Sequence, residues 1–372
     1  MTVHQILENW AQTRKEDGVR TALPPEAYTS EDMARLEREQ LFEKGWIVVA
    51  HVSQLLGVGD YVTYDLAGHP ILVVRGRDGV LRAFSNVCAH RSAVIAAGSG
   101  NRTVFQCPYH SWTYDLTGRL VAAPHMKKDV VAGIGLKPLG LEVWHGLVFV
   151  NLDADASALA PDLAGVDALT APYRIADHRV VLCEDMELAC NWKLFVENFC
   201  ESYHVFSVHP ETLEVGTPTT TTEIFPGGVG YNHHLMRNDS EALRVAAKGL
   251  GLPHNGMTPL HILCFYPASV ISFDSGAVVL ASVMPTGPRS SRARVWHSML
   301  PGDDGTIDLE HVDKSCAELR AFMAEDRAVI EGMQTGLAAG TGNRAPLHPW
   351  EASNWEFSQN LLQRLGIAGT AS

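Results

Sequence analysis

The chain has 372 residues, of which 46% are hydrophobic and 19% charged, and this is enough material for two globular domains that share an interface. A formal net charge of −13 argues against nucleic acid as a partner, because phosphate binding requires a basic surface. No apolar stretch has the length of a membrane span and the segment 1–20 does not resemble a signal peptide, so we expect a cytoplasmic protein without a membrane partner.

Seven cysteines form an odd set without the spacing of a small disulfide-bonded scaffold, and we therefore expect reduced thiols. Five of them lie outside the motifs described below. We interpret these five as buried, inert thiols: Cys183, Cys190, Cys200, Cys264 and Cys316.

The N-terminal region predicts one amphipathic helix over 29–42, with Ser30 as its N-cap. From Trp46 onward, short β-rich runs alternate with Gly, Asp and Pro signals. The predicted strands cover 46–50, 61–64, 71–75, 81–84, 104–106, 141–143 and 147–151. They indicate a compact antiparallel domain over 46–155. A helical segment over 1–45 precedes it and is expected to pack on the second domain, 156–372.

Two short motifs inside this domain each combine a thiol with an imidazole, namely Cys88-Ala-His90-Arg and Cys107-Pro-Tyr-His110. A binuclear iron–sulfur cluster with two thiolates on one iron and two imidazoles on the other needs this mixture. A Cys2His2 zinc site is the alternative, although zinc motifs usually keep the two cysteines in one pair and the two histidines in the other. Ordinary core cysteines beside loop histidines are a weaker third interpretation.

The run Cys-x-His-Arg followed by Cys-Pro-Tyr-His-Ser-Trp resembles the Rieske [2Fe-2S] proteins. The resemblance implies that Cys88 and Cys107 hold one iron, that His90 and His110 hold the other, and that Trp112 packs beside the cluster and limits access of water. Four basic residues lie on or near this segment and form either a positive collar for an acidic redox partner or an ordinary solvated surface: Arg91, Arg102, Lys127 and Lys128.

The remaining residues, 156–372, predict a second domain. A helix over 161–171 precedes a strand over 180–183, and strands over 260–265, 269–273, 278–284 and 293–299 follow as successive members of one sheet. A long helix over 308–337, a glycine-containing loop over 340–343 and a closing helix over 354–365 complete this domain.

The stretch 191–209 combines a buried helix, whose aromatic residues recur at helical spacing, with several polar residues. An α-helix turns by about 100° per residue, so Glu201 and His204 lie on adjacent faces and can project into one cavity. His209 does not align with His204 on a continuous helix, and Pro210 follows it. We therefore expect the helix to bend or end between the two histidines.

Two histidines need a carboxylate to complete the 2-His-1-carboxylate set that leaves coordination positions free on ferrous iron. Asp326 is the one charged residue on the apolar stripe of the long helix, which consists of Leu309, Val312, Cys316, Leu319, Met323, Ile330, Met333 and Leu337. A carboxylate on a buried stripe carries a large desolvation cost unless it is paired or metal-bound, so a buried ion pair is the alternative. Glu325 and Glu331 fall off the stripe and are interpreted as solvated.

The motifs Asn-Trp-Lys, Glu-Asn, Glu-x-Tyr-His and His-Pro, followed by a distant Glu-Asp and Gln-x-Gly-Leu, resemble the catalytic α subunits of Rieske non-haem iron oxygenases. The resemblance covers about 46–337. It implies that His204, His209 and Asp326 bind the mononuclear iron, and that Asn198 belongs to the catalytic site. It also implies that Glu201 bridges this iron site to His110 of an adjacent subunit, which requires a ring-like oligomer, most simply a homotrimer.

The implied fold is α+β, with an antiparallel β Rieske domain followed by a catalytic domain in which helices flank an antiparallel sheet, as in helix-grip folds. The implied cofactors are a [2Fe-2S] cluster and Fe(II), with O2 as co-substrate. Electrons from NAD(P)H would arrive through a separate ferredoxin or flavin-containing reductase, because the chain has no convincing Gly-x-Gly-x-x-Gly fingerprint.

A Glu at position 201, where the family commonly has Asp, resembles the branch that oxidises carnitine, betaine and stachydrine. The expected reaction is hydroxylation or oxidative N-demethylation of a small quaternary ammonium or N-methyl compound. Aromatic side chains attract such cations, and the candidate pocket walls are Phe199, Phe206, Tyr231, His233, Phe265 and Phe273.

Two other functions stay open from the sequence. One is hydroxylation or O-demethylation of an aromatic acid whose carboxylate meets Arg237 or Arg244. The other, from a different class, is a Rieske electron carrier or sensor without catalytic activity.

Overall fold

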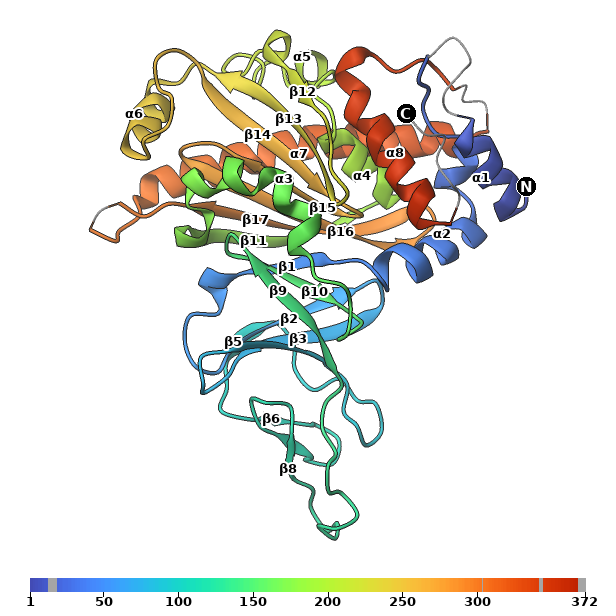
Figure 1. Ribbon diagram of the computed structural model, residues 1–372, viewed down its shortest axis with the longest axis vertical. Coiled ribbons are helices and arrows are strands. Elements are labelled where there is room, and N and C mark those ends of the chain that lie inside the picture. Colours follow the sequence, from blue (N-terminus) through green and yellow to red (C-terminus); the bar gives the residue numbers. More distant parts are fainter. Residues whose placement is uncertain (13–18, 303, 341–343, 367–372) are drawn as a thin grey trace. The chain divides into compact units, whose positions relative to one another are not determined.

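The computed structural model describes residues 1–12, 19–302, 304–340 and 344–366 (Figure 1). The chain divides into two compact units, Glu43–Leu159 and a larger one made of Met1–Phe42 together with Ala160–Ser372. The range 46–155 predicted for the first domain lies inside the smaller unit, and the N-terminal segment belongs to the larger one.

The smaller unit contains an antiparallel sheet with the strand order β1-β10-β9-β4-β3-β2-β5. The strands are β1 (Ile47–His51), β2 (Asp60–Leu66), β3 (His69–Arg75), β4 (Leu81–Ser85), β5 (Ser99–Asn101), β9 (Pro138–Trp144) and β10 (Leu147–Asn151). Strands β2 and β3 are joined through Ala67 and Gly68, which both have positive φ. This is the geometry of a two-residue hairpin turn that matches the natural twist of the strands.

A second, three-stranded sheet in this unit consists of β6 (Phe105–Gln106), β7 (Thr113–Tyr114) and β8 (Leu120–Ala122). Its buried side chains share one hydrophobic cluster with residues of the first sheet, including Tyr61, Phe84 and Leu72. Cys88 and Cys107 lie in the same cluster, so both predicted metal-binding loops start from a packed core.

The larger unit is built on a seven-stranded antiparallel sheet with the order β11-β17-β16-β15-β14-β13-β12. The strands are β11 (Arg179–Leu188), β12 (Glu223–Phe225), β13 (Tyr231–Asn238), β14 (Thr258–Phe265), β15 (Ser269–Phe273), β16 (Ala277–Gly287) and β17 (Ser290–Met299). The five predicted strands of this domain are confirmed. Strand β13 was not predicted, because its polar side chains, such as Asn232 and His234, hide its burial from a hydrophobicity pattern.

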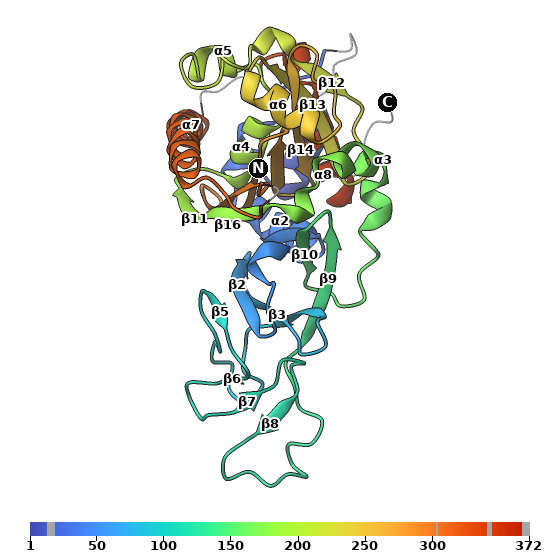
Figure 2. The ribbon, with the colours of Figure 1, turned by 90° about the vertical axis from the view of Figure 1, so that its left-hand side faces the viewer.

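Helices cover both faces of this sheet, as Figures 1 and 2 show for α3 (Ala160–Thr170) on one side and α7 (Leu309–Ala338) on the other. The short helix after α3 contributes Tyr173, whose ring lies 4.8 Å from that of Phe273. On the opposite face, His297 of β17 contacts Ser315 of α7 at 2.7 Å. The predicted α+β architecture is therefore confirmed.

The other helices of the larger unit are α1 (Val3–Ala11), α2 (Glu31–Glu37), α4 (Trp192–Phe199), α5 (Val205–Val208), α6 (Glu241–Gly249) and α8 (Ala352–Arg364). The backbone N–H of Met33 donates to Ser30 Oγ, which confirms the predicted N-cap of α2. The helix predicted over 29–42 changes at Arg38 into a π-helical segment, Arg38–Phe42. None of the described helices is long and apolar enough to span a bilayer.

Three further predictions need correction. The stripe of α7 is buried only from Cys316 to Ile330, because Leu309 lies in the first turn and is 75% exposed, and Met333 is 48% exposed while the neighbouring Gln334 is buried in its place. Cys183 is exposed, whereas the other four cysteines outside the motifs are buried as predicted. Most of the loop predicted over 340–343 lies outside the described residues.

Candidate metal centres

The two Cys/His loops of the smaller unit have the same backbone plan. The N–H of Ser92 donates to the carbonyl of Cys88, and the N–H of Ser111 donates to the carbonyl of Cys107. Both serines have positive φ, 57° and 58°, which is uncommon for residues with a side chain. Each loop therefore turns tightly just after its histidine, and it brings one buried thiol and one exposed imidazole to the same end of the unit.

The thiol of Cys88 lies in surroundings that favour its thiolate form. Burial opposes ionisation, but hydrogen bonds from Tyr114 and from the backbone N–H groups of His90 and Arg91 outweigh it, so the pKa of Cys88 is below its usual value. The Tyr114 hydroxyl lies 3.2 Å from Cys88 Sγ. Because thiolates are the form that binds iron, this environment fits a cluster ligand.

The two histidines lie close to each other and to the predicted tryptophan. The ring centroids of His90 and His110 are 4.8 Å apart, and Trp112 stacks on His90 at 4.6 Å with an interplanar angle of 6°. Trp112 is buried while both imidazoles are exposed. The four donors therefore fit one cluster whose imidazole side faces outward.

The basic residues near this site are all exposed. Arg91 lies over the ring of Tyr109 at 5.7 Å, and Arg102 lies over that of Tyr61 at 5.4 Å. Neither these two nor Lys127 forms an ion pair within the described part of the chain. Their charge is therefore open to a partner.

The second site is formed where α4 ends. The buried helix predicted within 191–209 was expected to bend or end between His204 and His209, but it already stops at Phe199, before the first histidine. The Glu201 carboxylate accepts backbone hydrogen bonds from Tyr203 and His204 and so competes with further helical bonding. The single turn of α5 then separates His204 from His209.

This break brings both histidines against Asp326 of α7. His209 Nε2 lies 2.8 Å from Asp326 Oδ1, and His204 Nε2 lies 3.5 Å from the same oxygen. One ligand atom from each of the three residues lies within 4.8 Å of the other two. Asp326 is only 5% exposed, so its charge needs a cation as neighbour. These donors fit a ferrous ion in a 2-His-1-carboxylate site.

Each of the two imidazoles also contacts a carboxylate of its own through the ring nitrogen that points away from Asp326. His204 Nδ1 lies 2.6 Å from Glu201 Oε1, and His209 Nδ1 lies 2.7 Å from Glu325 Oε2. Such contacts fix the ring orientation and tautomer of a metal-binding histidine. The interpretation of Glu325 as solvated was therefore wrong, because α7 turns it toward His209 at the edge of the buried stripe. Glu331 was also interpreted as solvated, but its carboxylate accepts a hydrogen bond from the backbone N–H of Ala189 at 3.0 Å.

A cavity of about 380 Å³ opens beside His204. It is bounded by the N-terminal segment 21–28, the end of α4, the C-terminal half of α7 and the segment before α8. Its polar lining includes Asn198, Glu201, Glu197 and Glu351, and no Lys or Arg among the described residues lines it. The predicted site residues Asn198 and Glu201 therefore share one cavity with a candidate ligand.

Four of the six predicted pocket walls lie elsewhere. Strand pairing places Tyr231 opposite Phe265 and His261 opposite Phe273, and these residues share the α3 face of the sheet with His233. The rings of Phe225 and His233 stack there at 4.6 Å. This corrects their assignment to the iron site, because α4 and α7 cover the opposite face.

The remaining two predicted walls are Phe199, which is half-buried near Phe195, and Phe206, which is 51% exposed. The residues of β13 that face the iron site are instead those whose side chains alternate with Tyr231 and His233 along the strand. His234 is 1% exposed, and burial first, then the neighbouring His233 and His204, lower its pKa to about 3. Sequence reasoning missed this neutral imidazole because β13 itself was missed.

Comparison with known proteins agrees with this arrangement. Residues 45–145 match the Rieske [2Fe-2S] domain, and residues 175–367 match the ring-hydroxylating α-subunit catalytic domain. The Rieske match decides between the iron–sulfur and zinc interpretations in favour of the cluster.

Two relatives are named carnitine monooxygenase oxygenase subunit. The protein of Acinetobacter baumannii is 37% identical over 324 residues, which is 84% of each chain. The protein of Escherichia coli K12 is 38% identical over 196 residues, 50% of this chain, and the match spans about half of that relative, 52% of its length.

Among solved structures, the quaternary ammonium Rieske monooxygenase CntA in complex with γ-butyrobetaine is similar, with a TM-score of 0.78 and 25% identity over 98% of this chain and 99% of that chain. The fold, the two donor sets and the family matches agree. The chain therefore belongs to the Rieske-type ring-hydroxylating oxygenase α subunits.

Proposed function

We propose that this protein is the terminal oxygenase of a Rieske-type system and oxidises a small organic cation, most simply a quaternary ammonium compound. The observation that carries the proposal is the convergence of His204, His209 and Asp326 beside a cavity that is lined by carboxylates and, within the described ranges, by no Lys or Arg. The names of the two relatives, which both refer to carnitine, agree with a cationic substrate.

Iron held by His204, His209 and Asp326 would activate O2, with electrons supplied by a [2Fe-2S] cluster held by Cys88, His90, Cys107 and His110. The chain's own residues position these groups. Glu201 and Glu325 hold the outer nitrogens of the two iron histidines, so that their inner nitrogens point at Asp326. The apolar part of the cavity, including Ile330 and Leu194, limits the water that reaches the substrate.

We further propose a homotrimer in which Glu201 links two subunits. Its Oε1 contacts His204, while the exposed imidazoles of the smaller unit and their basic surroundings complement the acidic cavity. In this arrangement His110 of the partner subunit donates to Glu201. A separate ferredoxin or flavin-containing reductase would supply electrons from NAD(P)H.

The bridging role predicts that Glu201→Gln, supplied with saturating Fe(II) because His204 also loses a partner, keeps both metals and the trimer but loses turnover. Glu211→Gln, an exposed carboxylate after the second iron histidine, is the matched control and should stay active. Iron content, the visible spectrum of the cluster and light scattering measure the first three properties. An active Glu201→Gln protein with normal coupling of NADH use to product would contradict the bridge.

The substrate class is tested with a panel of carnitine, γ-butyrobetaine, glycine betaine, an aliphatic diamine and a methoxybenzoate. NADH consumption, formaldehyde release and product mass spectra are followed with a suitable reductase. Oxidation of at least one cation, with little activity on the aromatic acid, is expected. Product from the aromatic acid alone would refute the proposed substrate class.

The two arginines that were expected to bind the carboxylate of an aromatic acid both pair with acidic side chains of the protein itself. Arg237 pairs with Glu223 at 2.6 Å, and Arg244 pairs with Asp239 at 2.5 Å and with Glu241 at 2.8 Å. Both guanidinium groups are therefore already neutralised. The non-catalytic alternative predicts two irons per chain, whereas an oxygenase holds a third that a chelator removes while the cluster spectrum persists.

A further inference from the structure

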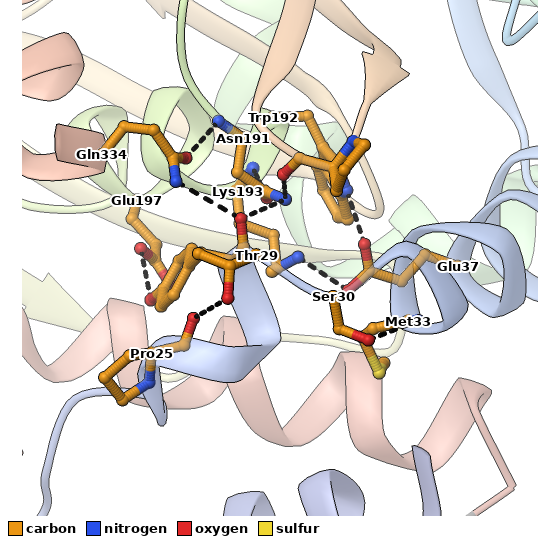
Figure 3. A network of polar contacts seen from close by, with 12 residues as sticks. Pro25, Thr29, Ser30, Met33, Glu37, Asn191, Trp192, Lys193, Glu197 and Gln334 are labelled. Atoms are coloured by element: carbon orange, nitrogen blue, oxygen red, sulfur yellow. Dashed lines mark hydrogen bonds and ion pairs between the residues drawn. The ribbon is translucent and has the colours of Figure 1, made fainter. Parts of the chain in front are cut away.

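A buried polar network connects the N-terminal segment to α4 behind the cavity (Figure 3). Lys193 Nζ lies 2.7 Å from Glu37 Oε1, and both side chains are almost completely buried. The indole N–H of Trp192 donates to the other Glu37 oxygen at 2.9 Å. The Lys193 ammonium is thus paired with Glu37.

Glu197, one turn further along α4, has a different partner. Its two carboxyl oxygens lie 2.8 and 2.9 Å from the hydroxyl oxygen of Tyr28. Within the described part of the chain, this hydroxyl is the only hydrogen-bond partner of the Glu197 carboxyl. Part of the Glu197 surface faces the cavity beside His204.

The Tyr28 hydroxyl can serve both protonation states of Glu197. An ionised Glu197 accepts the hydroxyl proton, which lowers its pKa. A protonated Glu197 accepts from Tyr28 through one oxygen and donates to it through the other, so both short contacts persist. The charge count favours the neutral form, because the Lys193 ammonium faces two carboxyl groups and neutralises Glu37.

Burial and the neighbouring carboxylates favour the protonated form of Glu197, whereas the charge of Lys193 opposes it. Burial is the main cause that raises the pKa of Glu197, to about 7, while the Tyr28 hydrogen bond and the Lys193 charge lower it, and Glu37 and Glu351 raise it. The cavity also contains Glu201 and His204, and the wall from α7 is apolar at Val329, Ile330 and Met333.

We infer that Glu197, held by Tyr28, is a proton-holding residue that delivers protons into the cavity beside His204 during turnover. The inference rests on the proposed function. Insertion of one atom of O2 into a C–H bond consumes two electrons and two protons, forms the C–OH group and releases one water. The electrons come from the reductase, and the protons must cross the protein.

In this scheme Glu197 loses its proton to the cavity, which has room for several waters, and regains one from solvent before the next transfer. Glu197 does not touch the candidate iron ligands, so it acts as a positioning and proton-supplying residue. Tyr28 keeps the carboxyl directed at the cavity and lowers its proton affinity enough for release.

The first test needs no turnover. Infrared difference spectra of the full-length protein at a series of pH values should contain a carboxylic acid C=O band that is lost near neutral pH. The band should be absent in Glu197→Gln and present in Glu356→Gln, whose carboxyl is also buried but does not line the cavity. A Glu197 that is ionised at every pH above 5 would overturn the inference.

The second test follows kcat against pH and in D2O with a cation that the protein oxidises. The wild type should lose kcat as pH rises through the Glu197 titration and show a solvent isotope effect. Tyr28→Phe should move this limb to higher pH, because it removes a hydrogen bond that lowers the pKa of Glu197. Glu197→Gln should remove both the limb and the isotope effect, with a drop of about tenfold or more in kcat.

Glu197→Asp retains a carboxyl and should restore part of kcat and the pH limb, which a purely structural role would not predict. A folded, iron-loaded Glu197→Gln protein that keeps the wild-type limb and isotope effect would overturn the inference. A wild-type protein that shows the infrared titration but oxidises no cation would refute the proposed function, while the band would still support the proton-holding site.

Discussion

The buried pair of Lys193 and Glu37 allows a quantitative prediction. Lys193→Met replaces the ammonium with an apolar group of similar length, so packing changes little. Glu37, whose side chain is 1% exposed, then loses its ion pair and keeps the Trp192 N–H as a neutral partner. Breaking a buried pair on one side costs about 3–5 kcal/mol of the free energy of unfolding.

For a unit of this size, each kcal/mol corresponds to about 2–4 °C in Tm, so Lys193→Met should melt about 6–20 °C lower than the wild type. The double variant Glu37→Gln with Lys193→Met removes both charges and should recover most of the loss. Thermal and urea unfolding followed by circular dichroism measure both effects.

The matched control is Lys248→Met at the exposed end of α6, which should change stability by less than about 0.5 kcal/mol. A loss of less than about 1 kcal/mol in Lys193→Met, or a double variant as unstable as the single one, would contradict a stabilising buried pair.

Three further predictions concern the two metal sites and the buried histidines. Glu325→Gln should weaken iron binding by about tenfold or more, measured by chelator competition, while the cluster spectrum stays unchanged. Glu318→Gln on the exposed side of α7 is the control and should bind iron normally. Equal iron affinities of the two variants would contradict the role of Glu325. Tyr114→Phe removes a hydrogen-bond donor from Cys88 Sγ and should lower the reduction potential of the cluster, measured by voltammetry. The control Tyr109→Phe should leave the potential unchanged. An unchanged potential in Tyr114→Phe would show that this hydrogen bond does not tune the cluster. Burial lowers the pKa of His233 to about 4 and that of His261 to about 3, so the unfolded chain binds more protons than the folded one below pH 6.5, and stability should fall as pH decreases. Between pH 8 and 5 each imidazole should cost about 2 kcal/mol in urea unfolding, and His233→Phe should remove about half of the combined loss; the same pH slope in that variant would disprove the assignment.

The sequence alone was sufficient wherever a function depends on residues close together in the chain. The two Cys/His motifs, the pair His204 and His209, and the strands rich in β-branched residues were all visible in this way. Asp326 was also found, because a single charge interrupts a regular apolar stripe and a helix has a known period.

Only the tertiary structure decided which distant residues complete the sites. Glu325 reaches His209 across 116 positions, and Tyr28 reaches Glu197 across 169. No local pattern encodes such contacts, because they depend on how helices pack. The faces of β13 are a second case: a shift of one residue in a strand reverses the direction of every side chain, so the sequence could not separate His233 from His234, but the pairing of β13 with β14 does.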